Sequence, residues 1–320
     1  MIKPAVFAAA FLAAVACTAH AEVDREALYK HIRKSFNVPL AMQMELGELK
    51  PSPVAGFDQG TLTLRSGGRE GTKPLLITKD GRFYYLSEVH SLEPSKFQGL
   101  ASTPDASDAP SLNVTNDLKH FFFGKPTDLS IDPDAANLAK IKPEGAPSLG
   151  PANAPVLIVE YSDLQCPYCS KAHQEIEANL VKTYGKKVRW IFKHYPLTNI
   201  HPWAFDAAAA SLCAYKAKPE AFWKFTAAIF EKQRETTPAN LRERMLASAK
   251  AAGVAGAKFE ACFDGKGGKA AVEADVAEAN ALGVNSTPTI FVNGRKVEGF
   301  DTFDSLKAVI DEKLAEKGLK

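Results

Sequence analysis

The clearest hydrophobic pattern in the chain lies between residues 156 and 180. An apolar run rich in β-branched side chains opens at Val156 and predicts a buried strand. After Pro167, apolar residues recur at helical spacing at Ala172, Ile176 and Leu180. The sequence therefore predicts a strand that leads directly into an amphipathic helix.

The rest of the C-terminal half continues this alternation of strands and helices. Apolar runs predict strands over residues 188–194 and 285–292, and Asn293-Gly294 predicts a hairpin turn after the second strand. Between them, residues 197–282 are rich in alanine and show no strand pattern, which indicates a helical insertion. One apolar face along residues 303–314 predicts a final helix that covers the sheet. The expected class is α/β.

The N-terminal part predicts a smaller α+β domain. A helical pattern follows Asp24, which can cap the helix, and strand-like runs occur at residues 60–65 and 75–78. An Asp80-Gly81 turn followed by apolar residues predicts a hairpin. With only about 65 residues, such a domain would be marginally stable alone. We therefore expect it to bind a partner surface, such as a second copy of itself.

Residues 1–21 have the features of a secretory signal peptide: a lysine, a short apolar stretch and the small-x-small pattern Ala19-His20-Ala21. The apolar stretch is too short to span a bilayer, and no later stretch is long enough. We expect an exported, periplasmic protein. A lipoprotein attached through Cys17 is the alternative.

Composition separates the two predicted domains. Residues 101–117 are rich in Ala, Ser, Pro and Asp, and they begin a linker that we place at residues 101–144. The domains then occupy residues 22–100 and 145–320. The net charge of +2, without basic clusters, gives no reason to expect a nucleic-acid partner.

Two cysteines separated by two residues carry the candidate chemistry. Cys166 lies where the predicted strand meets the predicted helix, and a helix N-terminus stabilises a thiolate and lowers its pKa. Cys169 follows nearly one turn later, close enough to form a disulfide with Cys166. This pattern is typical of redox proteins in which one cysteine attacks and the other resolves.

Haem and zinc sites use the same cysteine spacing. Haem attachment requires His directly after the second cysteine, and this chain has Ser170 there. Zinc would find three ligands in Cys166, Cys169 and His173, but no second close pair supplies a fourth. We therefore expect a redox dithiol without a metal or a cofactor.

The remaining cysteines suggest a second pair. After removal of the signal peptide four cysteines remain, and an even number in an exported chain suggests pairing. If Cys166 pairs with Cys169, then Cys213 and Cys262 are the two cysteines that remain to form a disulfide with each other. That pair would be structural.

Two further features, Glu160 and the Thr287-Pro288 bond, are candidates for a role in the chemistry of the dithiol. Glu160, near the end of the predicted strand, is either a buried proton relay for Cys169 or a carboxylate turned to solvent. A cis bond before Pro288 would turn the backbone of Thr287 outward, where it could pair with an extended substrate. On the residues alone a trans bond is favoured. His194 and His201 show no spacing that assigns them a partner.

Several motifs occur together in the C-terminal half: Ala154-Pro155-Val156, Tyr161 to Cys169, His194-Tyr195-Pro196-Leu197 and Thr287-Pro288. Together they resemble the DsbA-like thioredoxin domain of exported thiol-disulfide oxidoreductases, over about residues 145–320. The resemblance implies a thioredoxin-like fold with a helical insertion.

The same resemblance implies roles for individual residues. Cys166 would be the nucleophile, Cys169 the resolving thiol and Glu160 the buried acid. Substrate would bind at Pro167, Tyr168, Thr287 and a cis Pro288. Cys213 and Cys262 stand where some relatives have an extra bridge in the helical insertion.

The N-terminal motifs Leu49 to Phe57 and Asp80 to Leu86 are similar to the dimerisation domain of DsbC/DsbG-type disulfide isomerases. Cys-Pro-Tyr-Cys, with Thr before the proline at position 288, also looks more like the isomerase branch than the strong oxidases. The long interval between Gly99 and Pro155 departs from the compact linker helix of those isomerases. The resemblance implies a homodimer.

We therefore expect an exported thiol-disulfide isomerase or reductase that acts on misoxidised proteins. Its expected partners are substrate proteins with disulfides and a membrane thiol-disulfide relay protein. The alternatives are a DsbA-like oxidase that donates disulfides, a holdase chaperone, and a copper-stress protein that binds metal through Cys166, Cys169 and His173.

Overall fold

The computed structural model describes residues 23–36, 38–52, 54, 56–86 and 127–319. The predicted signal peptide and the first part of the predicted linker lie outside these residues. The chain divides into two compact units, one of residues 1–28 and 43–130, the other of residues 29–42 and 131–320. The division falls within α1 (Arg25–Ser35). None of the described helices is long and apolar enough to cross a membrane.

The N-terminal unit contains an antiparallel sheet with the order β1-β3-β4-β5-β6, in which β2 pairs with β3. The long hairpin of β3 and β4 dominates it, and the aromatic rings of Phe57 and Tyr85 pack edge to face at 5.8 Å. The turn before β5 contains Gly81 at a positive φ, as an Asp-Gly hairpin requires. The strands are β1 (Gln43–Leu46), β2 (Lys50–Pro51), β3 (Phe57–Ser66), β4 (Arg69–Thr78), β5 (Phe83–Leu86) and β6 (Thr127–Asp128).

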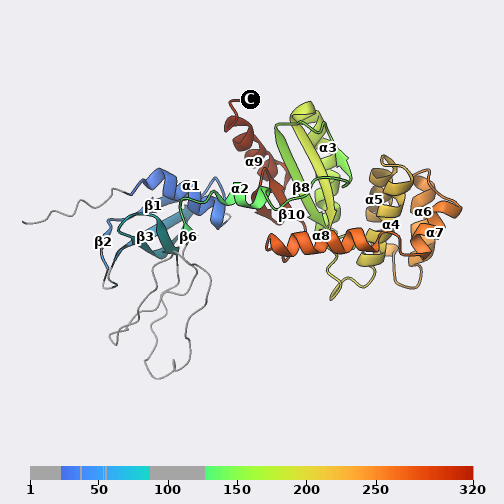
Figure 1. The fold of residues 1–320 in the computed structure, drawn as a ribbon, viewed down its shortest axis with the longest axis horizontal. Helices are drawn as coiled ribbons and strands as arrows, with labels where there is room; N and C mark the ends of the chain where they lie inside the picture. Colours follow the sequence, from blue (N-terminus) through green and yellow to red (C-terminus); the bar gives the residue numbers. More distant parts are fainter. Residues whose placement is uncertain (1–22, 37, 53, 55, 87–126, 320) are drawn as a thin grey trace, which may run out of the picture. The chain divides into compact units, whose positions relative to one another are not determined.

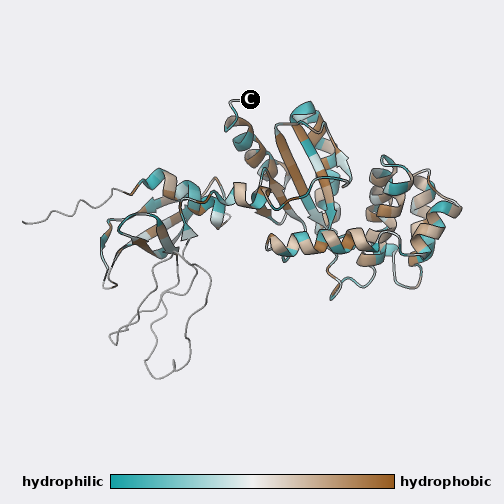
Figure 2. Cartoon of the chain, viewed as in Figure 1, coloured by the Kyte–Doolittle hydropathy of each residue, from teal (hydrophilic) through white to brown (hydrophobic). Residues whose placement is uncertain are grey.

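The C-terminal unit is built on a five-stranded sheet with the order β11-β10-β8-β9-β7 (Figure 1). The central strand β8 runs parallel to β9 and antiparallel to β10. The strands are β7 (Ser148–Leu149), β8 (Val156–Ser162), β9 (Val188–His194), β10 (Thr289–Val292) and β11 (Arg295–Glu298). Figure 2 shows β8 and β10 as strongly hydrophobic strands, as expected for strands buried on both faces.

Helices cover both faces of this sheet. On one face, α3 and α9 pack with Ile158, Trp190 and Phe192, while α8 lies on the opposite face near Val159 and Ile191. Thr302 caps α9 in a capping box with Ser305. The helices are α2 (Pro133–Leu138), α3 (Pro167–Tyr184), α4 (Ala204–Ala217), α5 (Ala221–Glu231), α6 (Leu241–Ala251), α7 (Ala257–Asp264), α8 (Lys269–Ala281) and α9 (Phe303–Ala315), with short 3-10 turns at Gly185–Lys187 and Gln233–Glu235.

The predicted fold class is confirmed. The chain is mixed α/β, and the helices α4 to α8 between β9 and β10 all lie within residues 197–282, where the sequence predicted an insertion. The structure differs in two places. The strand predicted from residue 285 begins only at Thr289, because residues 285–288 form the loop that contains Pro288. The predicted linker at residues 101–144 also contains β6 and α2, and α2 is capped by Asp132 with proline at its first position.

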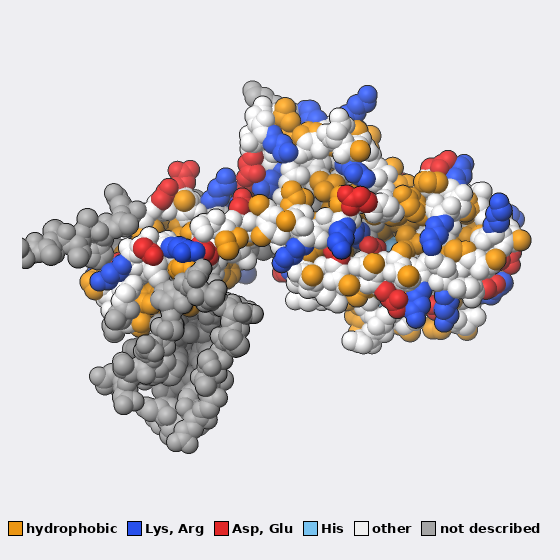
Figure 3. All heavy atoms as spheres, in the orientation of Figure 1, with side chains coloured by type: hydrophobic (Ala, Val, Ile, Leu, Met, Phe, Trp, Pro, Cys, Tyr) orange, Lys and Arg blue, Asp and Glu red, His pale blue; other side chains and the backbone are white. Residues whose placement is uncertain are grey.

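Charged side chains of both signs are interspersed over the visible face of the C-terminal unit (Figure 3). Ion pairs along or between the helices of this unit include Arg242 with Asp264 and Lys307 with Asp311. Exposed pairs of this kind contribute little stability each. The core therefore holds the unit together, and Cys166 and Cys169 both belong to it.

Candidate active site

The two cysteines lie at the junction of β8 and α3. Cys166 is the residue before the first helical turn, with an extended backbone (φ −78°, ψ 123°), and Pro167 begins the helix. The carbonyl of Cys166 accepts the N-H of Ser170 at 3.1 Å, which begins the helical hydrogen bonds. The Cys166 side chain is 4% exposed and that of Cys169 is fully buried. Both are free thiols.

The two sulfurs have opposite pKa shifts. A hydrogen bond from the Cys169 thiol lowers the pKa of Cys166 to about 6, helped by the backbone N-H groups of Cys169 and Tyr168 and by Thr287, against the opposing effect of burial. Burial and the neighbouring Cys166 raise the pKa of Cys169 well above 9. At neutral pH the pair therefore consists of a Cys166 thiolate and a Cys169 thiol.

The loop before β10 brings its backbone to the sulfur of Cys166. The carbonyl oxygen of Thr287 lies 3.5 Å from the sulfur of Cys166. The bond between Thr287 and Pro288 is cis, as the resemblance implied and not as the residues alone favoured. Pro167 and Tyr168 are exposed beside the cysteines, and the Tyr168 side chain is 67% exposed. Tyr168 thus presents an aromatic surface to any molecule that approaches Cys166.

Glu160 is fully buried in the middle of the sheet. It lies opposite Ile290 of β10 and Phe192 of β9, and its Oε2 accepts the indole N-H of Trp190 at 3.2 Å. Burial raises the pKa of Glu160 to about 7. Of the two orientations that the sequence left open, the structure has the buried one, with a carboxyl able to gain or lose a proton near neutral pH.

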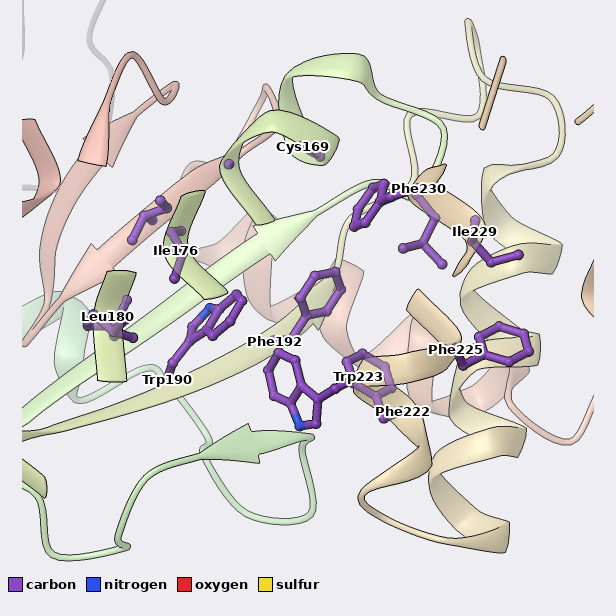
Figure 4. Packing of buried hydrophobic residues seen from close by; sticks show 14 of the residues in the cluster. Cys169, Ile176, Leu180, Trp190, Phe192, Phe222, Trp223, Phe225, Ile229 and Phe230 are labelled. Carbon is purple, nitrogen blue, oxygen red and sulfur yellow. The ribbon is translucent and has the colours of Figure 1, made fainter. Parts of the chain in front are cut away.

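His173 lies one helical turn beyond Cys169 and is 1% exposed. Its ring is surrounded by the rings of Trp190, Phe192, Trp223 and Phe230, at centroid distances of 5.1 to 6.1 Å. Figure 4 shows these four aromatic side chains in the same hydrophobic cluster as Cys169. Burial lowers the pKa of His173 to about 4, so the imidazole is neutral. No group of three or more His, Cys, Asp or Glu in the described part of the chain is placed to hold a metal.

Sequence reasoning missed the residues that hold the active-site loop. The buried carboxylate of Asp163 accepts the N-H groups of Gln165 and Leu197 and lies 2.7 Å from Nδ1 of His201. The side-chain amide of Gln233 donates to the carbonyls of Leu164 and Cys166 at 3.0 Å each. Except for Gln165, these partners lie in or beside the helical insertion, 34 to 69 residues away in the chain, so no local spacing reveals them.

The other two cysteines form a disulfide. Cys213 of α4 and Cys262 of α7 are bonded, with 49 residues of sequence separation and a Cα distance of 5.8 Å. The bond ties two helices of the insertion together, and Cys166 and Cys169 are the free cysteines of the described residues.

Three comparisons bear on the C-terminal unit. A family profile described as thioredoxin matches residues 142–312, more than half of the chain. Disulfide bond formation protein D of Bacillus subtilis is 28% identical over 179 residues, which are 54% of this chain and 79% of that protein. The crystal structure of a variant of alpha-DsbA1 from Wolbachia pipientis has a TM-score of 0.50 at 25% identity and covers 56% of this chain and 96% of its own.

Larger proteins contain a similar segment. The Na(+)/H(+) antiporter NhaA 3 of Salinispora tropica is 34% identical over 171 residues, which are 53% of this chain and 25% of the antiporter. The chain thus spans about a quarter of the length of these curated relatives. The transport activity in their names belongs to those proteins.

Proposed function

Because the chain belongs to the thioredoxin family, we propose that it is a thiol-disulfide oxidoreductase whose reactive pair is Cys166 and Cys169. The observation that carries this proposal is the opposite shift of the two pKa values, toward about 6 for Cys166 and well above 9 for Cys169. The ionised sulfur attacks, and the protonated sulfur stays inactive until it loses its proton. The relatives named disulfide bond formation protein D and alpha-DsbA1 support the same class of activity.

The reaction proceeds by two exchanges. The Cys166 thiolate attacks one sulfur of a substrate disulfide, forms a mixed disulfide and releases the other substrate sulfur as a thiolate. Cys169 then loses its proton and attacks Cys166, which releases the second substrate thiol and leaves a Cys166–Cys169 disulfide. Two electrons pass from the protein dithiol to the substrate. Glu160 takes up the proton of Cys169, and the Thr287 backbone with Pro167, Pro288 and the exposed Tyr168 borders the site where the substrate lies.

The lowered pKa of Cys166 also makes the protein a stronger oxidant. At pH 7 a pKa of about 6 instead of 9.0 favours the reduced form by about 1.4 kcal/mol. That corresponds to a potential raised by about 30 mV. Solvent screening at the sulfur makes these figures upper values. A shift of this size suits a protein that exchanges disulfides with substrates better than one with a purely structural bridge.

We further propose that the activity is isomerisation or reduction of wrong disulfides by an exported, periplasmic homodimer. The signal-peptide pattern of residues 1–21 and the similarity of residues 22–100 to an isomerase dimerisation domain support this proposal. In it, residues 145–320 form the catalytic domain, residues 101–144 the linker, and a membrane thiol-disulfide relay protein keeps Cys166 reduced.

A donor oxidase is the second candidate, and the names of the bacterial relatives favour it. The two candidates differ in resting redox state. Trapping of free thiols in freshly isolated protein should find Cys166 and Cys169 mostly reduced in an isomerase and mostly oxidised in an oxidase. A monomer by light scattering would argue against the isomerase.

Refolding of scrambled ribonuclease tests the activity itself. The wild-type protein should restore ribonuclease activity, and Cys166→Ser should abolish this effect. Cys169→Ser is the matched control, since it keeps the nucleophile and should accumulate mixed disulfides. If Cys166→Ser still restores ribonuclease, the assignment of the nucleophile is wrong. If a variant that carries both Cys166→Ser and Cys169→Ser still suppresses the aggregation of unfolded proteins, the protein would instead be a holdase.

A further inference from the structure

Two polar groups on one face of β8 lack a hydrogen bond of normal geometry within the described structure. They are Oε1 of Glu160 and the hydroxyl of Ser162, and both side chains are fully buried. Residues two apart on a strand point to the same side of the sheet, so the two groups are neighbours. Buried polar groups nearly always have partners. Two such groups beside a reactive dithiol therefore suggest a function.

The Ser162 hydroxyl neighbours both the carboxyl of Glu160 and the sulfur of Cys169. The backbone N-H of Asp163, the next residue, donates to the sulfur of Cys169 at 3.3 Å, so that sulfur lies against the end of β8. The Ser162 hydroxyl is near enough to lower the pKa of both Glu160 and Cys169. A hydroxyl can accept one hydrogen bond while it donates another. Ser162 thus has the chemistry needed to pass a proton between its two neighbours.

Building on the activity proposed above, we propose that Ser162 relays the proton between Cys169 and Glu160 when the mixed disulfide is resolved. The Ser162 oxygen takes the proton of the Cys169 thiol while its own proton passes to the Glu160 carboxylate. The result is a Cys169 thiolate, an unchanged serine and a neutral Glu160. The thiolate then attacks Cys166, and the released substrate sulfur takes its proton from solvent.

Among the described residues, no other ionisable group near the relay competes for this proton at neutral pH. On α3, His173 is held neutral by burial, which lowers its pKa to about 4. At the end of β9, burial lowers the pKa of His194 to about 3. The Asp163 carboxylate is turned to Gln165, Leu197 and His201. Lys193 pairs with Asp275 and Glu278 of α8, on the opposite face of the sheet.

Reaction of the reduced protein with Ellman's reagent separates the two steps. Attack by Cys166 releases the first thionitrobenzoate, and attack by Cys169 on the resulting mixed disulfide releases the second. In the wild type, the rate of the second phase should rise with pH through the pKa of Glu160, about 7. In Ser162→Ala the second phase should slow by about 100-fold and lose this dependence. The first phase should be unchanged, because the groups that lower the pKa of Cys166 are Cys169, Thr287 and the N-H of Tyr168, all of which remain in the variant.

Two comparisons make the result specific to the hydroxyl. Ser162→Thr and Ser162→Val have nearly the same shape, so the second phase should be fast only in the threonine variant, even if both lose some stability. In Glu160→Gln the second phase should be slow already, and adding Ser162→Ala should slow it no further. Equal second phases in the threonine and valine variants, or independent effects in the double variant, overturn the relay. A normal first phase in those variants would leave the proposed activity standing.

Discussion

Replacing Cys169 with alanine isolates the hydrogen bond that contributes most to the lowered pKa of Cys166. The wild-type sulfur, with a pKa of about 6, is about half ionised at pH 6. The backbone N-H groups at the start of α3 and the side chain of Thr287 remain in the variant. If about half of the shift from 9.0 persists, the pKa of Cys166 in the variant becomes roughly 7.5. The ionised fraction at pH 6 then falls about 16-fold, to roughly 0.03.

Alkylation rates alone would understate this change. A thiolate becomes more nucleophilic as its pKa rises, and a rise of about 1.5 units offsets roughly a factor of five. The net loss of rate at pH 6 is then only about threefold. The ultraviolet absorbance of the thiolate, titrated in the reduced protein, reports ionisation directly. Cys169→Ser is the control, because its hydroxyl can still donate to Cys166. An alanine variant that titrates at the wild-type pH would refute the role assigned to the Cys169 thiol.

Three further predictions concern stability. Burial raises the pKa of Glu160 from 4.5 to about 7, so the wild-type protein loses stability as pH rises through this interval. The Glu160→Gln variant has no such group. Between pH 4 and pH 8 its free energy of unfolding, measured in urea, should therefore rise by about 3 kcal/mol relative to that of the wild type. Gly294→Ala would put a Cβ into the backbone oxygen of Asp134, and it should lower the melting temperature far more than Gly283→Ala, where φ is also positive but the space is open. Removing both Cys213 and Cys262 should lower the free energy of unfolding by up to about 4 kcal/mol and leave the alkylation rate of Cys166 unchanged.

Local sequence patterns were sufficient wherever neighbouring residues determine the structure. The strand and helix around Cys166 and the hairpin at Asn293 follow from apolar periodicity and from a turn that needs two residues at positive φ. The final helix along residues 303–314 and the alanine-rich insertion also follow from local patterns. These features account for the fold class and for the position of the dithiol at a helix N-terminus.

The sequence could not reveal features that depend on distant partners. Whether Glu160 is buried depends on the helices that cover both faces of the sheet and on β9 and β10, which flank β8. The partners of Asp163 come from the segment before α4, and Gln233 comes from the turn after α5. Their spacing in the chain is set by the lengths of the insertion helices and carries no chemical signal of its own. Only the folded arrangement shows that they meet at the active-site loop.

The amide of Gln233 links the insertion to the dithiol, because it binds the main-chain carbonyl of Cys166 itself. A smaller catalyst, made by removing the inserted helices from the thioredoxin core, would therefore also lose hydrogen bonds that hold the loop before Cys166. It would leave the carbonyls of Leu164 and Cys166 without this donor and the Asp163 carboxylate without the N-H of Leu197. Anyone who engineers a smaller version would have to rebuild those contacts, or accept a looser loop around the reactive sulfur.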